Sequence, residues 1–206
     1  MPLDARRAQL LEAGLQLFQE QSYEAVSIED IARAVGISKG LLYHYFGGKR
    51  AFYVAVVREA ADRLVEAARP DRTLDRPQQA IAGMNAYLDF VEQRSGVFLA
   101  LMQGGLGTDP DVAGIIRDTR TVFAEQILEG VGVSPDRPVF RTAARSYVGT
   151  VEAASLAWLE DPSVGREALV ALLLSALDGI MRAASALDPD AGLDLDPRTP
   201  HPLLPF

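Results

Sequence analysis

The stretch from Ser27 to Lys49 is SIEDIARAVGISKGLLYHYFGGK, and its pattern predicts two short helices joined by a tight turn. Ser27 is a favourable helix cap, and Asp30 three residues later completes the sequence pattern of a capping box. Gly36 follows the first helix, because glycine readily adopts the left-handed backbone that ends a helix. Ser38 is suited to cap a second helix of about two turns. This arrangement predicts a helix-turn-helix.

The second helix has two distinct faces when its residues are placed at intervals of about 100°. Leu42 and Phe46 share the side that would pack on the preceding helices. Gly40, Leu41 and His44 lie on the opposite side of the helix. Tyr43 and Tyr45 flank them on the left and right. A helix in the DNA major groove needs this layout, with contacting residues toward the base edges and hydrogen-bonding groups toward the phosphates.

The charge around this helix favours a polyanionic partner. A glycine pair at 47–48 ends the helix, and Lys49 then begins the next one, where its ammonium and the free N–H groups could serve a phosphate. No acidic residue lies between Asp30 and Glu59, a segment with five basic residues. Residues 1–69 carry no net charge, so the whole formal charge of −8 belongs to the residues after 69. An acidic remainder of the protein repels DNA and so favours one orientation of the DNA on the basic segment.

These residues resemble the recognition-helix region of the TetR family of transcriptional repressors. The resemblance is carried by the first helix up to LQLF and by LLYHYFGGK at 41–49, and covers roughly the first quarter of the chain. It implies a dimeric, all-helical regulator with a ligand-binding C-terminal part. It also implies DNA contacts at Ser27, Ser38, Lys39, Gly40, Tyr43, Tyr45 and Lys49.

Leu41 is a departure from the family pattern, which more often has a small or hydroxyl-bearing residue at this position. Leucine offers a base edge only an apolar contact. With Leu41 and His44 from the outward face of the helix, the predicted set of DNA contacts comprises nine residues.

The composition excludes several classes of site. The 206-residue chain has no cysteine, which rules out disulfides, thiolate zinc sites and a cysteine nucleophile. Its two histidines, His44 and His201, argue against a histidine metal cluster, and we expect no metal and no cofactor. No signal peptide is apparent, and the apolar run at 168–177 is too short to cross a bilayer. We therefore expect a soluble, cytoplasmic protein with no membrane partner.

Apolar periodicity predicts an all-α fold of about nine helices. A helix from Lys49 to Arg69 should link a DNA-binding head to the rest of the chain, and Pro70 should stop it. The glycine cluster at 104–107 follows no strand and has no neighbouring Lys-Ser/Thr, so we expect a loop. The other helices are expected at 4–21, 78–94, 97–103, 110–131, 138–160 and 163–187. The predicted domains are a head at 1–48, an effector-binding and dimerisation domain at 49–187, and a Pro- and Asp-rich tail at 188–206.

The last two long helices are apolar over much of their circumference and contain many small residues. Such helices need cover on two sides, and small residues let helices approach closely. One cover would be the protein's own core and the other a second copy, which predicts a homodimer that reads a palindromic operator. The alternative is that both helices are buried within one subunit.

Aromatic and sulfur-containing residues are concentrated in the middle of the chain. Core packing explains many of them, but the family resemblance implies an internal cavity for an apolar or amphipathic effector. The candidate ligand contacts are Met84, Tyr87, Phe98, Met102, Gln103, Arg120, Phe123 and Tyr147.

The sequence therefore predicts a ligand-responsive DNA-binding regulator, a repressor that a small effector releases from its operator. Two alternatives remain. One is a helical module that binds small molecules or proteins and merely retains a helix-turn-helix. The other is an enzyme, although no Ser-His-Asp set, carboxylate pair or metal cluster can be assembled from the residues.

Overall fold

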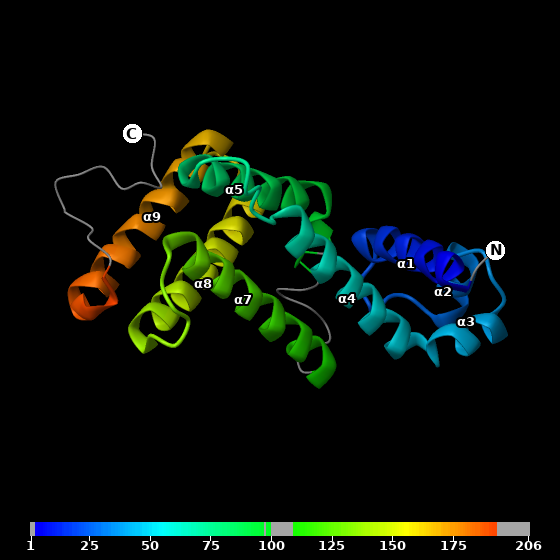
Figure 1. The fold of residues 1–206 in the computed structure, drawn as a ribbon. Helices are drawn as coiled ribbons and strands as arrows, with labels where there is room; N and C mark the ends of the chain where they lie inside the picture. Colours follow the sequence, from blue (N-terminus) through cyan, green and yellow to red (C-terminus); the bar gives the residue numbers. More distant parts are fainter. Residues whose placement is uncertain (1–2, 97, 100–108, 193–206) are drawn as a thin grey trace. The chain divides into compact units, whose positions relative to one another are not determined.

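The computed structural model describes residues 3–96, 98–99 and 109–192, and every regular element in these ranges is a helix (Figure 1). The all-α prediction is confirmed, with eight α-helices among the described residues. Most of the helix expected at 97–103, the glycine cluster and most of the tail lie outside them; residues 98 and 99 are described and are helical. The elements are α1 (Leu3–Glu20), α2 (Ile28–Ala34), α3 (Lys39–Phe46), α4 (Lys49–Ala67), α5 (Arg76–Gln93), α7 (Pro110–Val131), α8 (Pro138–Glu160), α9 (Arg166–Leu187) and the short 3-10 helix η1 (Pro189–Ala191).

The chain divides into two compact units. The first contains residues 1–64 and 93–117, and the second contains 65–92 and 118–206. The first unit is thus larger than the predicted head of residues 1–48, because a segment distant in sequence joins it. The helix α4 begins in the first unit and has its last residues in the second.

Local signals in the sequence form the helix-turn-helix as predicted. The Ser27 hydroxyl accepts the Asp30 N–H at 3.1 Å, and the Asp30 carboxylate accepts the Ser27 N–H at 3.1 Å, so the capping box is complete. Gly36 has a φ of 69° and Gly47 a φ of 81°, both in the left-handed region where glycine is favoured. The start and the end of each helix are therefore encoded in a few neighbouring residues.

Aromatic rings join α1, α3 and α4 in the core of the first unit. The rings of Phe46 on α3 and Phe52 on α4 meet edge to face with centroids 4.9 Å apart. Phe18 on α1 meets Tyr53 in the same way at 4.9 Å. Edge-to-face aromatic pairs add about 0.5–1.5 kcal/mol to the burial of their surface. These pairs fix the inner face of α3.

The segment at 93–96 packs closely on the end of α1. The Gln19 side-chain amide donates to the Gln93 carbonyl at 3.0 Å. A Cβ added to Gly96 would lie 2.0 Å from the Gln19 carbonyl oxygen, so only glycine fits there without movement of the backbone. Glu12 on α1 accepts from Arg63 of α4, and it also forms an ion pair with Arg94 at 3.6 Å.

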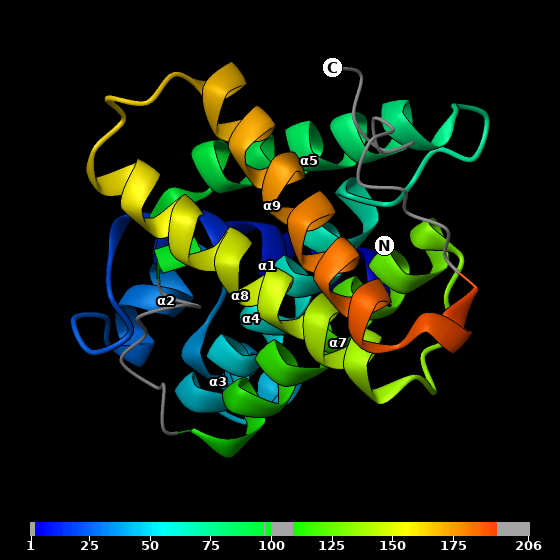
Figure 2. The ribbon, with the colours of Figure 1, turned by 90° about the vertical axis from the view of Figure 1, so that its left-hand side faces the viewer.

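In the second unit α8 and α9 lie side by side (Figure 2). Among the described helices, α9 is long and apolar enough to cross a membrane by length and composition alone. Our sequence estimate missed this because it counted only residues 168–177. The side chains Leu169, Leu173, Leu177 and Met181 of α9 are buried in the second unit, as in a core helix.

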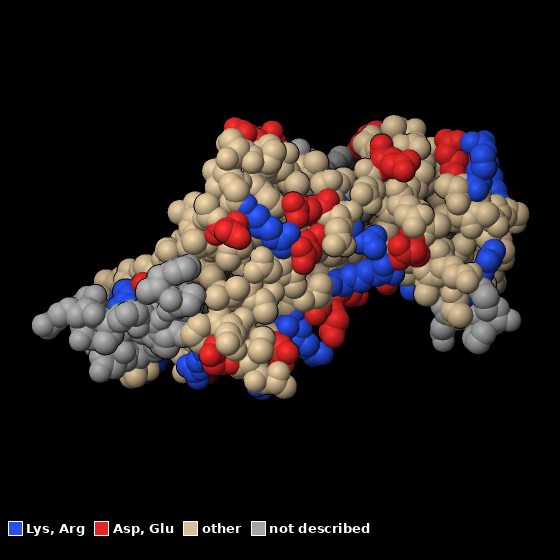
Figure 3. Space-filling view, turned by 90° about the horizontal axis from the view of Figure 1, so that it is seen from above, with Lys and Arg blue, Asp and Glu red and all other residues tan. Residues whose placement is uncertain are grey.

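Arginines fasten the ends of α9 to other helices of the second unit. Arg166 at its start contacts Asp89 at 2.6 Å and Glu92 at 2.7 Å, both on α5. Arg137, before α8, contacts Asp188 at the end of α9 at 2.7 Å. Figure 3 shows basic side chains lying next to acidic ones on the face that it displays. Much of the basic charge is therefore already paired within the protein.

Candidate nucleic-acid interface

The helix α3 presents its two faces as its sequence predicts. Leu42 and Phe46 are buried against the first unit. On the other side Leu41 is 37% exposed and Tyr43 is 50% exposed. The remaining candidates on α3 and its flanks are exposed or half-buried: Ser27, Ser38, Lys39, Gly40, His44, Tyr45 and Lys49. The structure thus brings the nine predicted DNA contacts together on the solvent side of one helix-turn-helix.

Two aromatic contacts position the end of α3 and the start of α4. The Lys49 ammonium lies 4.2 Å from the centroid of the Tyr23 ring, a cation–π contact that holds the charge at the surface. Tyr43 lies against Gly48, where an added Cβ would be 3.4 Å from the ring. The phenol and the ammonium therefore flank the turn between the two helices.

The two serines predicted to contact DNA both cap helices. Ser27 belongs to the capping box of α2, and the Ser38 hydroxyl accepts the Leu41 N–H at 3.1 Å. A hydroxyl that accepts at a cap still has a proton to donate, and the Ser27 hydroxyl donates it to Asp30 at 2.5 Å. Among the described residues no acceptor takes the Ser38 proton, so Ser38 is the better placed of the two to donate to a phosphate.

Lys39 is not a free cation in this structure. Its ammonium pairs with the Glu29 carboxylate on α2, and this contact raises the pKa of Lys39 and lowers the pKa of Glu29. Glu29 was not predicted as a partner of Lys39, although it lies only ten residues before it. Both side chains are about half exposed, so the pair is weak and a phosphate could replace the carboxylate.

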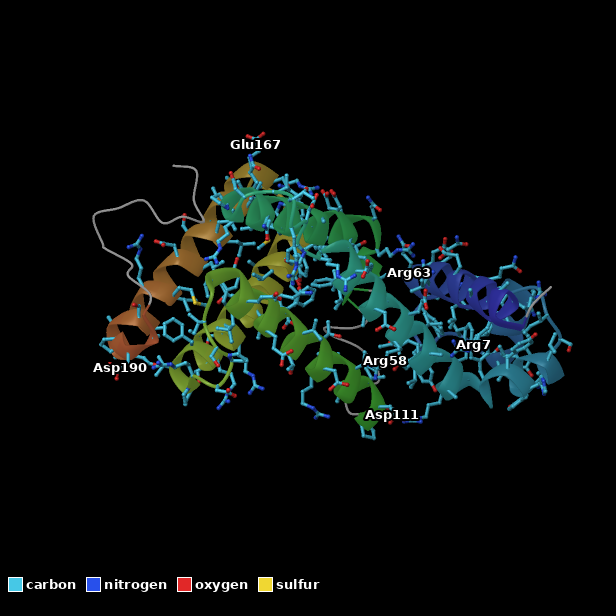
Figure 4. All side chains as sticks on the ribbon, in the orientation of Figure 1. Arg7, Arg58, Arg63, Asp111, Glu167 and Asp190 are labelled. Carbon is cyan, nitrogen blue, oxygen red and sulfur yellow. The ribbon has the colours of Figure 1, made fainter. Side chains whose placement is uncertain are left out.

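A stronger set of ion pairs lies one residue beyond Lys49. Arg50 donates to both oxygens of Asp109, from Nε at 2.6 Å and from Nη2 at 2.8 Å. Its Nη2 also donates to Asp111 at 2.7 Å, in the first turn of α7 (Figure 4). Asp109 in turn accepts the Asp111 N–H at 2.9 Å and so helps to cap α7. We name these three residues the Arg50 clamp; it fixes the start of α4 to the start of α7 within the first unit.

The Arg50 clamp also sets the charge state of Asp109, whose side chain is only 6% exposed. Hydrogen bonding to the Arg50 guanidinium lowers the pKa of the Asp109 carboxyl, and the N–H groups of Val112 and Asp111 lower it further against the opposing effect of burial. Asp109 is therefore held as a carboxylate. Sequence analysis marked Asp109 only as the start of a helix, because its partner is 59 residues away.

A second group of candidates meets inside the second unit. Tyr87 on α5 and Phe123 on α7 contact each other edge to face at 6.1 Å. Tyr87 is also close enough to Tyr147 on α8 to contribute, after burial, to the raised pKa of Tyr147. Burial raises the pKa of both tyrosines, so both hydroxyls are protonated at neutral pH. The Tyr87 hydroxyl interacts with Ser155. The buried Tyr147 hydroxyl has no hydrogen-bond partner among the described residues.

The other predicted ligand contacts are less clearly grouped. Arg120 is engaged by Glu152 at 2.8 Å, and Met84 is half-buried on α5. Phe98 is fully buried but belongs to the first unit. Met102 and Gln103 lie outside the described residues. Ser155 and Glu152 were not predicted as site residues, because neither a serine nor a glutamate within an alanine-rich helix carries a distinctive signal.

Comparisons with known proteins agree with this geometry. A model of the bacterial regulatory proteins of the tetR family matches residues 10–56, and a tetracyclin repressor-like C-terminal domain matches residues 77–178. A tetR-family transcriptional regulator from Streptomyces coelicolor is 31% identical in sequence, with a TM-score of 0.81 over 93% of this chain and 87% of that one. The chain belongs to the TetR family of transcriptional regulators.

Curated relatives of this TetR-family chain act in both directions on transcription. The transcriptional activator FasR of Mycolicibacterium smegmatis is 34% identical over 119 residues, which are 57% of this chain and 54% of FasR. The transcriptional repressor AcnR of Corynebacterium efficiens is 25% identical over 142 residues, 68% of this chain and 71% of AcnR. The chain therefore spans about half the length of FasR. Because the chain belongs to a family of transcriptional regulators, the alternative prediction that it is an enzyme is set aside.

The Arg50 clamp in this TetR-family protein predicts a specific pH dependence of stability. Because the folded pKa of Asp109 is below its ordinary value near 3.8, the stabilisation is complete above that value and is lost as the pH falls through the folded pKa. We expect Asp109→Asn to lower the urea midpoint at neutral pH, and the difference from the wild type to shrink in acid. Urea unfolding followed by circular dichroism across this pH range measures the difference.

Asp62→Asn is the matched control for this prediction, since Asp62 is exposed on α4 and the charge change is the same. It should leave the midpoint unchanged. A midpoint difference for Asp109→Asn that is constant at every pH would show that Arg50 does not stabilise the ionised carboxylate.

Proposed function

We propose that this TetR-family chain is a ligand-responsive repressor that binds a palindromic operator as a homodimer and is released by an apolar or amphipathic effector. The observation that carries the proposal is the outward face of α3, on which Leu41, Tyr43 and His44 are exposed between the cations Lys39 and Lys49. This face suits the major groove, with base edges opposite its centre and phosphates at its rims. Binding to DNA also places the protein in the cytoplasm.

The phosphate contacts in this proposal come from two places. Lys49 and the N-terminal N–H groups of α4 would hold one phosphate, because a lysine and a helix N-terminus both favour negative charge. Lys39 would hold another phosphate after exchanging its partner Glu29 for the DNA backbone. Each contact releases counterions, so operator binding should weaken steeply with salt.

We expect Lys49→Ala to weaken binding to all duplexes by a similar factor, because a phosphate contact carries no sequence information. The slope of log affinity against log salt should decrease in magnitude by about 0.9 for each head engaged. Fluorescence anisotropy of a labelled duplex over a series of salt concentrations measures this slope.

The control for Lys49→Ala is Arg72→Ala, which removes the same charge from a side chain that is 79% exposed between α4 and α5. Arg72→Ala should leave the slope unchanged. Equal slopes for the wild type and Lys49→Ala would remove Lys49 from the interface. A helical module without DNA-binding activity would give no salt-dependent duplex binding at all.

The homodimer in this proposal uses the exposed sides of α8 and α9. On α8 the exposed positions include the stripe Thr142, Ser146, Gly149, Thr150, Ala153 and Ala157. On α9 they include Ala168, Leu172, Ser175, Gly179, Ala183 and Ala186, with Leu172 61% exposed. Both stripes repeat at intervals of three and four residues, so they run along one side of each helix. Small side chains on adjacent helices allow a second helix pair to approach closely.

We expect Ala153→Arg to convert the dimer into a monomer, because a long charged side chain would be buried between closely packed helices. Size-exclusion chromatography with light scattering should then give the chain mass of 22.3 kDa in place of twice that mass. Ala8→Arg adds the same side chain at an exposed position of α1 and should remain dimeric. A dimeric Ala153→Arg protein would place the interface elsewhere.

The effector in this proposal is anchored by the Tyr147 hydroxyl. A buried hydroxyl without a partner is costly in the folded protein, and a ligand oxygen that accepts its proton would remove that cost. The surrounding rings of Tyr87 and Phe123 suit an apolar ligand body. In the dimer, the distance between the two DNA-binding heads would have two values, and a ligand that binds one of these forms more tightly would shift operator affinity by a coupling of about 1–3 kcal/mol. The helix α4, continuous from Lys49 to Ala67, would transmit the change.

We expect Tyr147→Phe to keep or slightly raise the melting temperature, because the variant loses no hydrogen bond within the protein. Fatty acids of graded chain length are the probes, and the one that best stabilises the wild type in a thermal shift assay should stabilise Tyr147→Phe less. The loss should be about fivefold in affinity, since one hydrogen bond contributes about 1 kcal/mol. A melting temperature several degrees lower would mean that the hydroxyl has a structural partner instead.

The experiment that tests the whole proposal is selection of bound duplexes from a random pool. Recovery of a palindrome whose half-sites are separated by about one helical turn or a multiple of it would support both the DNA-binding face and the two-fold symmetry. Recovery of no sequence, together with binding that is insensitive to salt, would contradict it.

A further inference from the structure

We propose that Leu41 reads sequence by packing against the 5-methyl group of a thymine in each operator half-site. This inference rests on the proposed DNA-binding function and adds the identity of a base that the protein requires. It assigns to an apolar side chain the specificity that many DNA-binding proteins obtain from hydrogen bonds.

Leu41 has no role in the core of the first unit. The buried side of α3 is formed by Leu42, which is fully buried, and by Phe46. Leu41 lies on the opposite side and is 37% exposed, although its N–H is already satisfied by Ser38. Only five large hydrophobic residues are exposed in the described part of the chain, and Leu41 and Tyr43 are neighbours among them. A leucine held outward at the centre of this face is therefore available for a partner.

The space around Leu41 is open toward that partner. Apart from its two sequence neighbours and the backbone of the helix itself, no atom of the described residues lies within 4 Å of a Cβ built on Gly40, so the helix surface next to Leu41 is open there. His44, one turn further along, is also exposed. A close approach of another molecule to this part of α3 meets a glycine, a leucine and an imidazole.

The charges around Leu41 favour DNA over an apolar protein surface. Lys39 and Lys49 flank the helix, and no acidic residue occurs from 31 to 58 in the sequence. The nearby carboxylate of Glu29 is taken up by Lys39. An apolar centre between cations is complementary to a methyl group that lies between two rows of phosphates.

Base chemistry then selects thymine. In the major groove the edges of guanine, adenine and cytosine present hydrogen-bonding groups, whereas thymine also presents a methyl group. Leucine cannot satisfy a donor or an acceptor, so covering one of the other edges would desolvate it without compensation. The exposed Leu41 side chain gains from burial only against the thymine methyl.

The spacing along α3 places His44 on a neighbouring base pair. Residues three apart on a helix are displaced by about 4.5 Å along its axis, compared with about 3.4 Å between successive base pairs. Leu41 and His44 therefore contact adjacent steps of the groove, and the methyl effect should be confined to one thymine in each half-site.

The test uses the duplex recovered from the random pool and replaces each thymine in turn, in both half-sites, by deoxyuridine, which lacks only the methyl group. For the wild-type dimer, deoxyuridine at one position, equivalent in the two half-sites, should lower the affinity for the duplex about fourfold per half-site. This factor corresponds to the free energy of burying one methyl group. In Leu41→Ala the same substitution should cost nothing. Tyr43→Phe, which keeps Leu41, should bind more weakly but retain the deoxyuridine penalty.

Leu41 is exposed, so Leu41→Ala should melt at the wild-type temperature, and circular dichroism checks that its fold is intact. A different result is that the wild type binds DNA in a salt-sensitive way while no thymine shows a deoxyuridine penalty that disappears in Leu41→Ala. That result would overturn the inference and leave the proposed function in place. Failure of the wild type to bind any duplex would overturn both. A penalty that persists unchanged in Leu41→Ala would assign the methyl contact to another residue.

Discussion

The edge-to-face contact between Phe46 and Phe52 is the constraint on which the DNA-binding face depends. Phe46 is the last residue of α3 and Phe52 lies in the first turn of α4, so the pair fixes the rotation of α3 about its own axis. With Phe46 and Leu42 turned inward, geometry leaves Leu41 and His44 pointing outward. A rotation of α3 that exposed Phe46 would lose the burial of a large ring, which is worth several times the thermal energy.

A second constraint ties this face to a segment that is distant in sequence within the first unit. The Arg50 clamp begins one residue after Lys49 and ends at the first turn of α7, so the residue that follows the predicted phosphate contact is held to the start of α7 by charged hydrogen bonds. The backbone at Gly96 also lies very close to Gln19, at the C-terminal end of α1. Both contacts lie within the first unit and join its N-terminal helices to residues that are more than 50 positions away in the sequence. The family relationship explains why such a fold serves transcription, and these contacts describe how this member is assembled.

Many of these features follow from short-range rules. The capping box of Ser27 and Asp30, the left-handed glycines at 36 and 47, and the inward Leu42 and Phe46 were all predictable from residues within a few positions of one another. The helix bounds also agree closely, because prolines and glycines at the ends of the helices act locally. The helix predicted from 163, by contrast, begins at Arg166, because Gly165 has an extended backbone and is the N-cap residue.

Local sequence patterns specify that the chain is helical, that it contains a helix-turn-helix and which side of α3 faces outward, because each of these features depends on periodicity and on neighbours one turn away. Tertiary packing alone sets four other features: residues 93–117 join the first unit, Arg50 is held by Asp109, Lys39 is paired with Glu29, and the Tyr147 hydroxyl is buried without a hydrogen-bond partner among the described residues. Those contacts join residues that are 10 to 59 positions apart or enclose a group from several helices. No local rule specifies which charged or polar side chain will meet which other, because the choice is made by the packing of whole helices.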